Sequence, residues 1–245
     1  MNAIQIKNIT KRYKDVTALD DVSFSFEFGK IYGFLGRNGA GKTTLINIIA
    51  NRIFADQGEI LIDGIPAKEN MGVHEKIFCM SEADLYDRDL KVKDHFKWTN
   101  RFYTDFDLKK AFELSKKFNL DTNKRFKALS KGYQSIFKLI IALSLNVPYV
   151  IFDEPVLGLD ANHRELFYSL LLKEFENNER TLIIATHLIE EVSNIIEEVV
   201  LIDKGKILVQ ETVEELLEKG YSVSGAAQRS EEHTSELQSP ITISY

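Results

Sequence analysis

Residues 36–43 carry the pattern in this chain that is best suited to chemistry. Their sequence, GRNGAGKT, fits G-x-x-x-x-G-K-[ST], in which glycines let backbone N–H groups wrap around phosphates. Lys42 would reach the β- and γ-phosphates of a nucleotide, and the Thr43 hydroxyl would be a ligand of Mg²⁺. We therefore predict a nucleotide site whose contact residues are Gly36, Arg37, Asn38, Gly39, Ala40, Gly41, Lys42, Thr43 and Thr44.

A pair of carboxylates, Asp153 and Glu154, follows the apolar run at residues 149–152. In open α/β sheets, ligands gather at the carboxyl ends of the strands. There Asp153 would hold Mg²⁺ through water, and Glu154 would polarise the water that attacks the γ-phosphate. Without the phosphate-binding segment upstream, two acidic residues at a solvated turn would be the simpler interpretation.

The phosphate-binding segment lies between an apolar strand pattern at residues 30–35 and an apolar helix pattern at residues 44–50. Helical patterns separate most of the later strands, and residues 92–126 show helical texture only. This alternation predicts an α/β fold with a largely parallel core sheet, an antiparallel β region and an inserted helical subdomain at about residues 88–145. Further strands are predicted at residues 4–9, 22–28, 58–64, 77–80, 149–152, 181–185 and 199–202, and further helices at residues 135–145, 164–177 and 189–196.

The composition is that of an ordinary globular protein, with 44% hydrophobic and 28% charged residues among 245. A formal net charge of −6 argues against nucleic acid as a partner. The single cysteine, Cys79, allows no intramolecular disulfide and fits a small core residue better than a redox switch. The sequence contains no apolar run of about 18 residues, so we expect a cytoplasmic chain that does not itself cross a membrane.

The segment Leu129-Ser130-Lys131-Gly132-Tyr133 precedes a predicted helix, which Ser130 can cap. Here the chain resembles the ATP-binding subunits of ABC transporters, which carry the signature LSGGQ at this place. Lys131 and Tyr133 depart from that signature, whereas Ser130 and Gly132 are kept. The resemblance implies that these two residues approach the γ-phosphate of an ATP molecule held mainly by a second subunit.

The resemblance extends over nearly all of residues 1–228 and implies further contacts with ATP. Tyr13 matches the aromatic residue that stacks on adenine, although a half-buried tyrosine at a strand end would look the same. Asp160 belongs to the loop that crosses to the partner subunit, in which Gly158 stands where alanine is usual. His187 matches the switch histidine that contacts the γ-phosphate.

One position departs from the family in a way that bears on mechanism. After the strand at residues 77–80 the family usually has a glutamine that links Mg²⁺ to the membrane partner, and here Ser81 and Glu82 stand there. Either Glu82 substitutes, or a water bridges, or the coupling is weaker. Five aromatic residues of the helical insertion form its core or line a groove for a helix of the membrane partner: Phe96, Trp98, Phe102, Tyr103 and Phe106.

The resemblance implies an ATPase that uses ATP and Mg²⁺ and pairs with a second nucleotide-binding subunit, of the same or another kind. ATP-driven dimerisation would power separate transmembrane permease subunits, with this chain peripheral on the inner face of the cell membrane. The altered signature and the Gly-Leu-Asp loop are similar to those of exporter-type cassettes, and the substrate depends on the permease. The alternatives are a soluble ABC-type ATPase of translation or DNA repair, a P-loop kinase or GTPase, and an ATP-binding regulator that hydrolyses poorly.

The last residues differ from the rest. Residues 229–239, RSEEHTSELQS, resemble the translation of a common short-read sequencing adapter, and residues 243–245 fit the place where the adapter resumes. We therefore treat residues 229–245 as an artefactual, disordered tail and expect the natural protein to continue differently after Gln228. The predicted ABC domain comprises residues 1–228.

Overall fold

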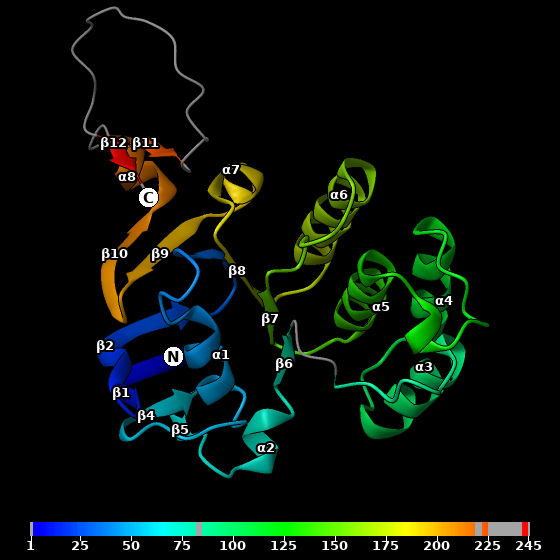
Figure 1. The fold of residues 1–245 in the computed structure, drawn as a ribbon, viewed down its shortest axis with the longest axis horizontal. Helices are drawn as coiled ribbons and strands as arrows, with labels where there is room; N and C mark the ends of the chain where they lie inside the picture. The colour runs from blue at the N-terminus through cyan, green and yellow to red at the C-terminus, as the bar shows by residue number, and fades with distance from the viewer. Residues whose placement is uncertain (1, 82–84, 219–221, 225–241, 245) are drawn as a thin grey trace, which may run out of the picture.

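Figure 1 shows the computed structural model, which describes residues 2–81, 85–218, 222–224 and 242–244. Its centre is a six-stranded sheet in the order β10-β9-β3-β8-β7-β6. The five strands from β9 to β6 run parallel, and β10 pairs antiparallel with β9. Their bounds are β3 Ile31–Leu35, β6 Ile77–Met80, β7 Tyr149–Asp153, β8 Thr181–Thr186, β9 Glu198–Asp203 and β10 Lys206–Thr212.

A second, antiparallel sheet has the order β2-β1-β4-β5. The apolar residues that alternate along β2 all point to the buried side of this sheet: Val22, Phe24 and Phe26 are buried. Side chains of the helix α1 (Lys42–Ile49) belong to the same buried cluster, which joins the two sheets. The four strands are β1 Ala3–Tyr13, β2 Val16–Glu27, β4 Gln57–Ile62 and β5 Ile65–Pro66.

The helical insertion forms a separate lobe beside the sheets (Figure 1). It contains α3 Val92–Phe102, α4 Leu108–Lys117, the short 3₁₀ helix Phe126–Ala128 and α5 Lys131–Ser144. The predicted aromatic residues do not all lie in the core of this lobe. Phe96 and Phe106 are buried in it, whereas Trp98 is 45% and Phe102 76% exposed. Tyr103 is partly buried against the same core.

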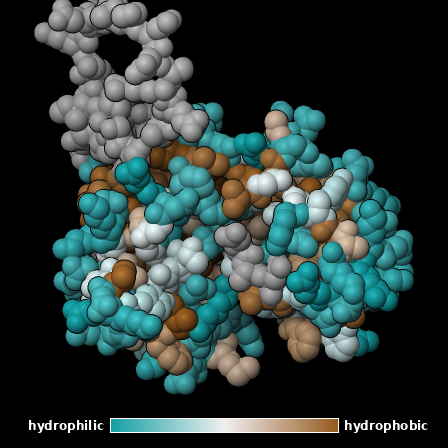
Figure 2. Space-filling model, in the orientation of Figure 1, coloured by the Kyte–Doolittle hydropathy of each residue, from teal (hydrophilic) through white to brown (hydrophobic). Residues whose placement is uncertain are grey.

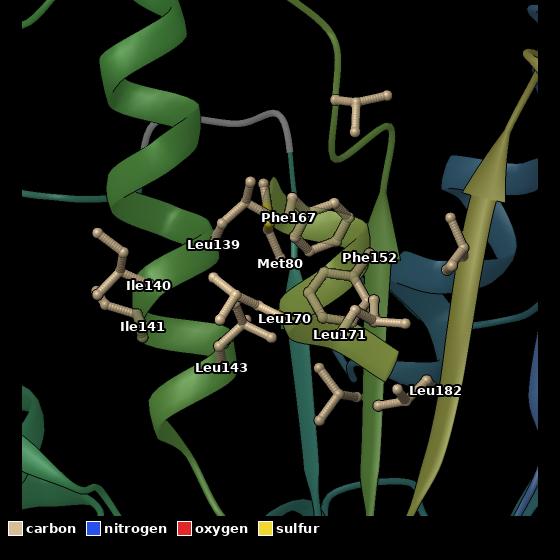
Figure 3. Packing of buried hydrophobic residues seen from close by; sticks show 14 of the residues in the cluster. Met80, Leu139, Ile140, Ile141, Leu143, Phe152, Phe167, Leu170, Leu171 and Leu182 are labelled. Carbon is tan, nitrogen blue, oxygen red and sulfur yellow. The ribbon is translucent and has the colours of Figure 1, made fainter. Parts of the chain in front are cut away.

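The remaining helices are α2 Met71–His74, α6 Ala161–Asn177, α7 Ile189–Val192 and α8 Val213–Glu218. The main core joins α5 and α6 to the central sheet, as Figure 3 shows for Leu139 and Leu143 of α5 and Phe167 of α6. Strand β7 is buried along its whole length, which explains its continuous apolar run. No described helix has both the length and the apolar character needed to span a bilayer.

The predicted fold class is confirmed, with differences at element ends. Helix α5 begins at Lys131, four residues before the predicted start, because Ser130 caps it. Helix α7 ends at Val192 instead of residue 196, and β10 was not predicted. Of the predicted tail, residues 229–241 and 245 lie outside the described residues, while β12 (Thr242–Ser244) pairs with β11 (Ser222–Ser224). The artefactual origin and the domain limits remain predictions.

Candidate functional site

The candidate site lies at the edge of the central sheet where three parallel strands end. Strand β8 lies between β3 and β7, with Leu35 opposite Thr186 and Asp153 opposite Ala185. The loop of residues 36–41 follows β3, Glu154 follows β7 and His187 follows β8. Segments that are more than a hundred residues apart in the sequence therefore meet at one edge, as the predicted strand pattern requires.

The loop after β3 depends on glycine at two positions because other chains approach it closely. A Cβ at Gly36 would lie 2.4 Å from the carbonyl oxygen of Ile202, and one at Gly41 would lie 2.7 Å from that of Ala18. Gly41 also has a φ of 114° and is the N-cap of α1. The first turn of α1 contains no acidic side chain, so its N–H groups and the positive end of the helix dipole favour an anion.

A cavity of about 410 Å³ opens over this loop, within the size range of small-molecule sites. Of the nine predicted phosphate-site residues, seven line it; Gly36 and Ala40 are buried instead. The other lining residues come from β2, from Glu154 and from the turn before β10. The full set is Val16, Thr17, Ala18, Arg37, Asn38, Gly39, Gly41, Lys42, Thr43, Thr44, Glu154, Lys204 and Gly205.

Lys42 is 5% exposed, and its ammonium group is held by the loop that it follows. The Nζ atom donates to the carbonyl oxygens of Gly36 at 2.5 Å and Arg37 at 3.3 Å, and it lies 3.5 Å from Oε1 of Glu154. Burial lowers the pKa of Lys42 below its ordinary value, and the negative charge of Glu154 opposes this effect. The site therefore presents a desolvated cation, which suits a phosphate group.

Glu154 is tied to the end of β8 by both carboxylate oxygens. The Thr186 hydroxyl donates to Oε2 at 3.1 Å, and Nδ1 of His187 lies 2.9 Å from Oε1. The backbone of Glu154 has a φ of 49°, a left-handed conformation that is strained for a residue with a side chain, and its N–H donates to the carbonyl oxygen of Ala185. These contacts bring the predicted base and the predicted switch histidine together.

The predicted metal ligands Thr43 and Asp153 also meet, since the Thr43 hydroxyl lies 3.3 Å from Oδ1 of Asp153. Oxygen ligands of this kind fit Mg²⁺, which takes few protein ligands and keeps several waters. No group of three or more His, Cys, Asp or Glu side chains that could form an all-protein metal cage occurs in the described ranges. A magnesium ion held between two side chains and substrate phosphates is compatible with this donor set.

Ser81 lies at the end of β6, next to β7, and is 7% exposed. Its hydroxyl has no hydrogen-bond partner in the part of the chain that the structure describes, and its carbonyl oxygen accepts from Nζ of the buried Lys138 at 3.2 Å. Glu82, the alternative ligand, lies outside the described residues. Lys138 was not predicted as part of the site, because a lysine within an apolar helix pattern gives no chemical signal.

Tyr13 lies at the end of β1, and its ring is 46% exposed. It pairs with Val16, which lines the cavity, while Tyr13 itself does not. Nζ of Lys11 lies 5.4 Å from the centre of the ring. An exposed flat ring at the cavity rim suits the predicted stacking on adenine, which stays a prediction.

The signature residues lie apart from the cavity. Ser130 is exposed at the N-terminus of α5, where its Oγ accepts from the N–H of Tyr133 at 3.4 Å. Neither Ser130 nor Gly132 lines the cavity that contains Lys42. Asp160 caps α6 by accepting from the N–H of His163 at 2.9 Å, and it too lies outside the cavity lining. One chain therefore does not bring these three residues to its own phosphate loop.

Several residues that touch the site are absent from the predicted set, and Thr186 and Lys204 are two of them. Thr186 orients Glu154 and also accepts from the N–H of Leu188 at 3.0 Å, and its position directly before His187 was the available signal. Lys204 lines the cavity from a turn that no strand pattern predicted. Both residues lie at strand ends. Their contacts with the site depend on which strands are neighbours in the sheet.

The chain is similar to known proteins in both sequence and fold. A family model described as "ABC transporter" matches residues 19–157. The chain is 31% identical to the "ABC transporter ATP-binding protein NatA" of Bacillus subtilis (strain 168), covering 88% of this chain and 92% of the relative. It is 28% identical to the "Petrobactin import ATP-binding protein YclP" of the same organism, covering 88% and 89%.

Among solved structures, a dimeric post-hydrolysis state of the ATP-binding cassette MJ0796 bound to ADP and Pi superposes with a TM-score of 0.77. The sequence identity is 25%, and the match covers 86% of this chain and 98% of that one.

Proposed function

The chain belongs to the ABC transporter family, and from that premise we propose that it is the ATP-hydrolysing subunit of a transporter. ATP-binding cassettes of this family are ATPases. The observation that carries the proposal is the meeting of three side chains: Glu154 contacts both Lys42 and His187, and Lys42 and Glu154 line one cavity. It supplies a phosphate-binding cation, a base and a second polar contact in one place.

In this proposal each residue has a task in hydrolysis. Lys42 and the first N–H groups of α1 hold the phosphates, and bound Mg²⁺, next to Thr43 and Asp153, would neutralise developing charge. Glu154 accepts the proton of the attacking water. Thr186 and His187 keep its carboxylate oriented, so that little reorganisation is needed when a water binds.

A second nucleotide-binding subunit completes the site in this proposal. Ser130 and Gly132 lie outside the cavity of their own chain, so they are free to cap the γ-phosphate held by a partner's Lys42. Two copies packed head to tail would bury two ATP molecules, each between the phosphate loop of one subunit and the signature of the other. The dimeric MJ0796 cassette has a fold similar to that of this chain, which supports this reading.

The remaining parts of the proposal concern the assembly. Residues 1–228 form one cassette with an inserted helical subdomain, and dimer closure and opening drive separate permease subunits. The chain is then cytoplasmic and peripheral on the membrane. Export is favoured by the altered signature and the Gly-Leu-Asp loop, whereas one relative, YclP, is named for import. The departures at Ser81 and Lys131 favour a second candidate, a regulatory cassette that binds ATP and hydrolyses it slowly.

Mixing two inactive variants tests the composite site. Lys42→Ala removes the phosphate contact, and Ser130→Asp keeps an acceptor that can cap α5 but repels the γ-phosphate. Each variant alone should hydrolyse almost no ATP, whereas a mixture forms heterodimers with one intact site and should recover a measurable fraction of the wild-type rate. Failure to recover activity, when light scattering shows that ATP pairs the two variants, would contradict the shared site.

A further inference from the structure

Arg164 lies in the first turn of α6 and contacts two segments beside the candidate site, the loop before α6 and the short helix α7. Its Nε donates to the carbonyl oxygen of Leu159 at 3.2 Å. Its Nη1 donates to Oε1 of Glu191, with which it forms an ion pair. The first contact holds the loop of residues 155–160, which follows Glu154, and the second holds α7, which begins two residues after His187.

The surroundings of this ion pair are partly desolvated. The Arg164 side chain is 38% and the Glu191 side chain 20% exposed, and Oε2 of Glu191 is buried. Burial and the negative charges of Glu191 and Glu154 raise the pKa of the nearby Tyr168 hydroxyl, while the charge of Arg164 opposes them. Arg164, Glu191 and Glu154 therefore act electrostatically on one buried hydroxyl.

The 155–160 loop has a further attachment on its other side. The Ser135 hydroxyl of α5 lies 3.4 Å from the carbonyl oxygen of Leu157, and a Cβ at Gly132 would lie 2.7 Å from that of Gly158. The loop is thus held between α5, which carries the signature, and Arg164 of α6. A guanidinium group suits this task because its planar donors can bond two acceptors at once.

We propose that Arg164 is a positioning residue for ATP hydrolysis. By bonding both segments, it fixes the position of the 155–160 loop relative to the segment from His187 to α7. The proposal rests on the proposed ATPase function. Glu154 and His187 lie at the starts of the two segments and contact each other, so a change in either segment alters the geometry of that contact. Arg164 itself reaches neither the cavity nor the phosphate loop.

Amide hydrogen exchange of the nucleotide-free full chain tests the positioning without requiring hydrolysis. Arg164→Met should speed exchange in residues 155–160 and 187–192 by about tenfold, because both charged bonds are lost. Arg164→Lys keeps an ion pair with Glu191 but lacks the Nε–H group that donates to Leu159, so only residues 155–160 should exchange faster. Lys110→Met is the matched control, since it removes another ion pair of α6, with Glu174, away from this edge.

Steady-state kinetics then tests the effect on the reaction. Arg164→Met should lower kcat by about tenfold and change KM for ATP by less than about twofold. Glu191→Gln should have a smaller effect of the same kind, and the double variant should be no slower than Arg164→Met, because both act through one contact. An inactive wild-type chain would overturn the proposed function, whereas normal exchange in Arg164→Met, or equal changes in Lys110→Met, would overturn the role of Arg164.

Discussion

Oε1 of Glu154 lies 2.9 Å from Nδ1 of His187, between the carboxyl ends of the neighbouring strands β7 and β8. The same oxygen lies 3.5 Å from Nζ of Lys42, which follows β3. The carboxylate of the proposed base therefore contacts both the proposed switch residue and the lysine that follows the phosphate loop. The parallel order of the three strands β3, β8 and β7 produces this arrangement.

Lys42→Ala should weaken the affinity for ATP by roughly a hundredfold, because a buried cation that bonds the phosphates would be lost. Titration with a fluorescent ATP analogue measures this change. Lys206→Ala is a suitable control, since Lys206 forms an exposed ion pair with Asp20 outside the cavity lining. Unchanged affinity in Lys42→Ala would contradict the assignment of the phosphate loop.

Tyr13→Ala should weaken ATP binding by about 1–3 kcal/mol if the exposed ring stacks on adenine. Tyr13→Phe keeps the flat ring and should bind as the wild type does. Comparing ATP with inorganic triphosphate separates the base from the phosphates, because triphosphate affinity should not change in either variant. If Tyr13→Ala binds ATP normally, the tyrosine is only a strand-end residue.

Gly158→Ala should destabilise the fold by about 1 kcal/mol, because Gly158 has a φ of 81°. No atom lies within 4 Å of the added Cβ, so the cost comes from the backbone alone. Urea denaturation measures it, with Gly72→Ala in α2 as a control that has no positive φ. Equal stability of both variants would show that the loop adapts to the alanine at no cost.

Cys79 should not react with an aromatic disulfide reagent at pH 8 in the folded chain and should react quickly in urea. Burial in β6 raises the pKa of its thiol to about 12, so at pH 8 almost none of the reactive thiolate is present. Rapid reaction of the native chain would contradict its place in the core. The absorbance of the released thiol follows the reaction directly.

Much of the central fold could be predicted because local patterns follow burial. Strand β6 was predicted at its observed bounds, and β7 and β8 each within one residue. The fully buried interior strands read as continuous apolar runs. Strand β10 was missed because its residues alternate between exposed and partly buried at the sheet edge. Helix α7 is shorter than predicted because the chain turns to enter β9.

Some residues of the candidate site could be predicted from the sequence and others could not. Lys42, Thr43 and Glu154 follow from residue type and from their place at strand ends. Thr186 and Arg164 could not be found by such reasoning, because their contacts depend on which strands and helices become neighbours. Ser81 differs from both groups. The sequence shows that a serine replaces the glutamine of the resembled family, but the effect of this serine on coupling depends on partners outside this chain.

The most direct test of the proposed ATPase site is ATP-dependent dimerisation and hydrolysis of Glu154→Gln, measured by light scattering and phosphate release with Mg²⁺. The glutamine keeps the shape of Glu154 but cannot accept the proton of water. We predict that this variant binds ATP, remains dimeric while ATP is present and hydrolyses it at least about a hundredfold more slowly than the wild type. Hydrolysis at the wild-type rate, or a variant that stays monomeric with saturating ATP, would contradict the account.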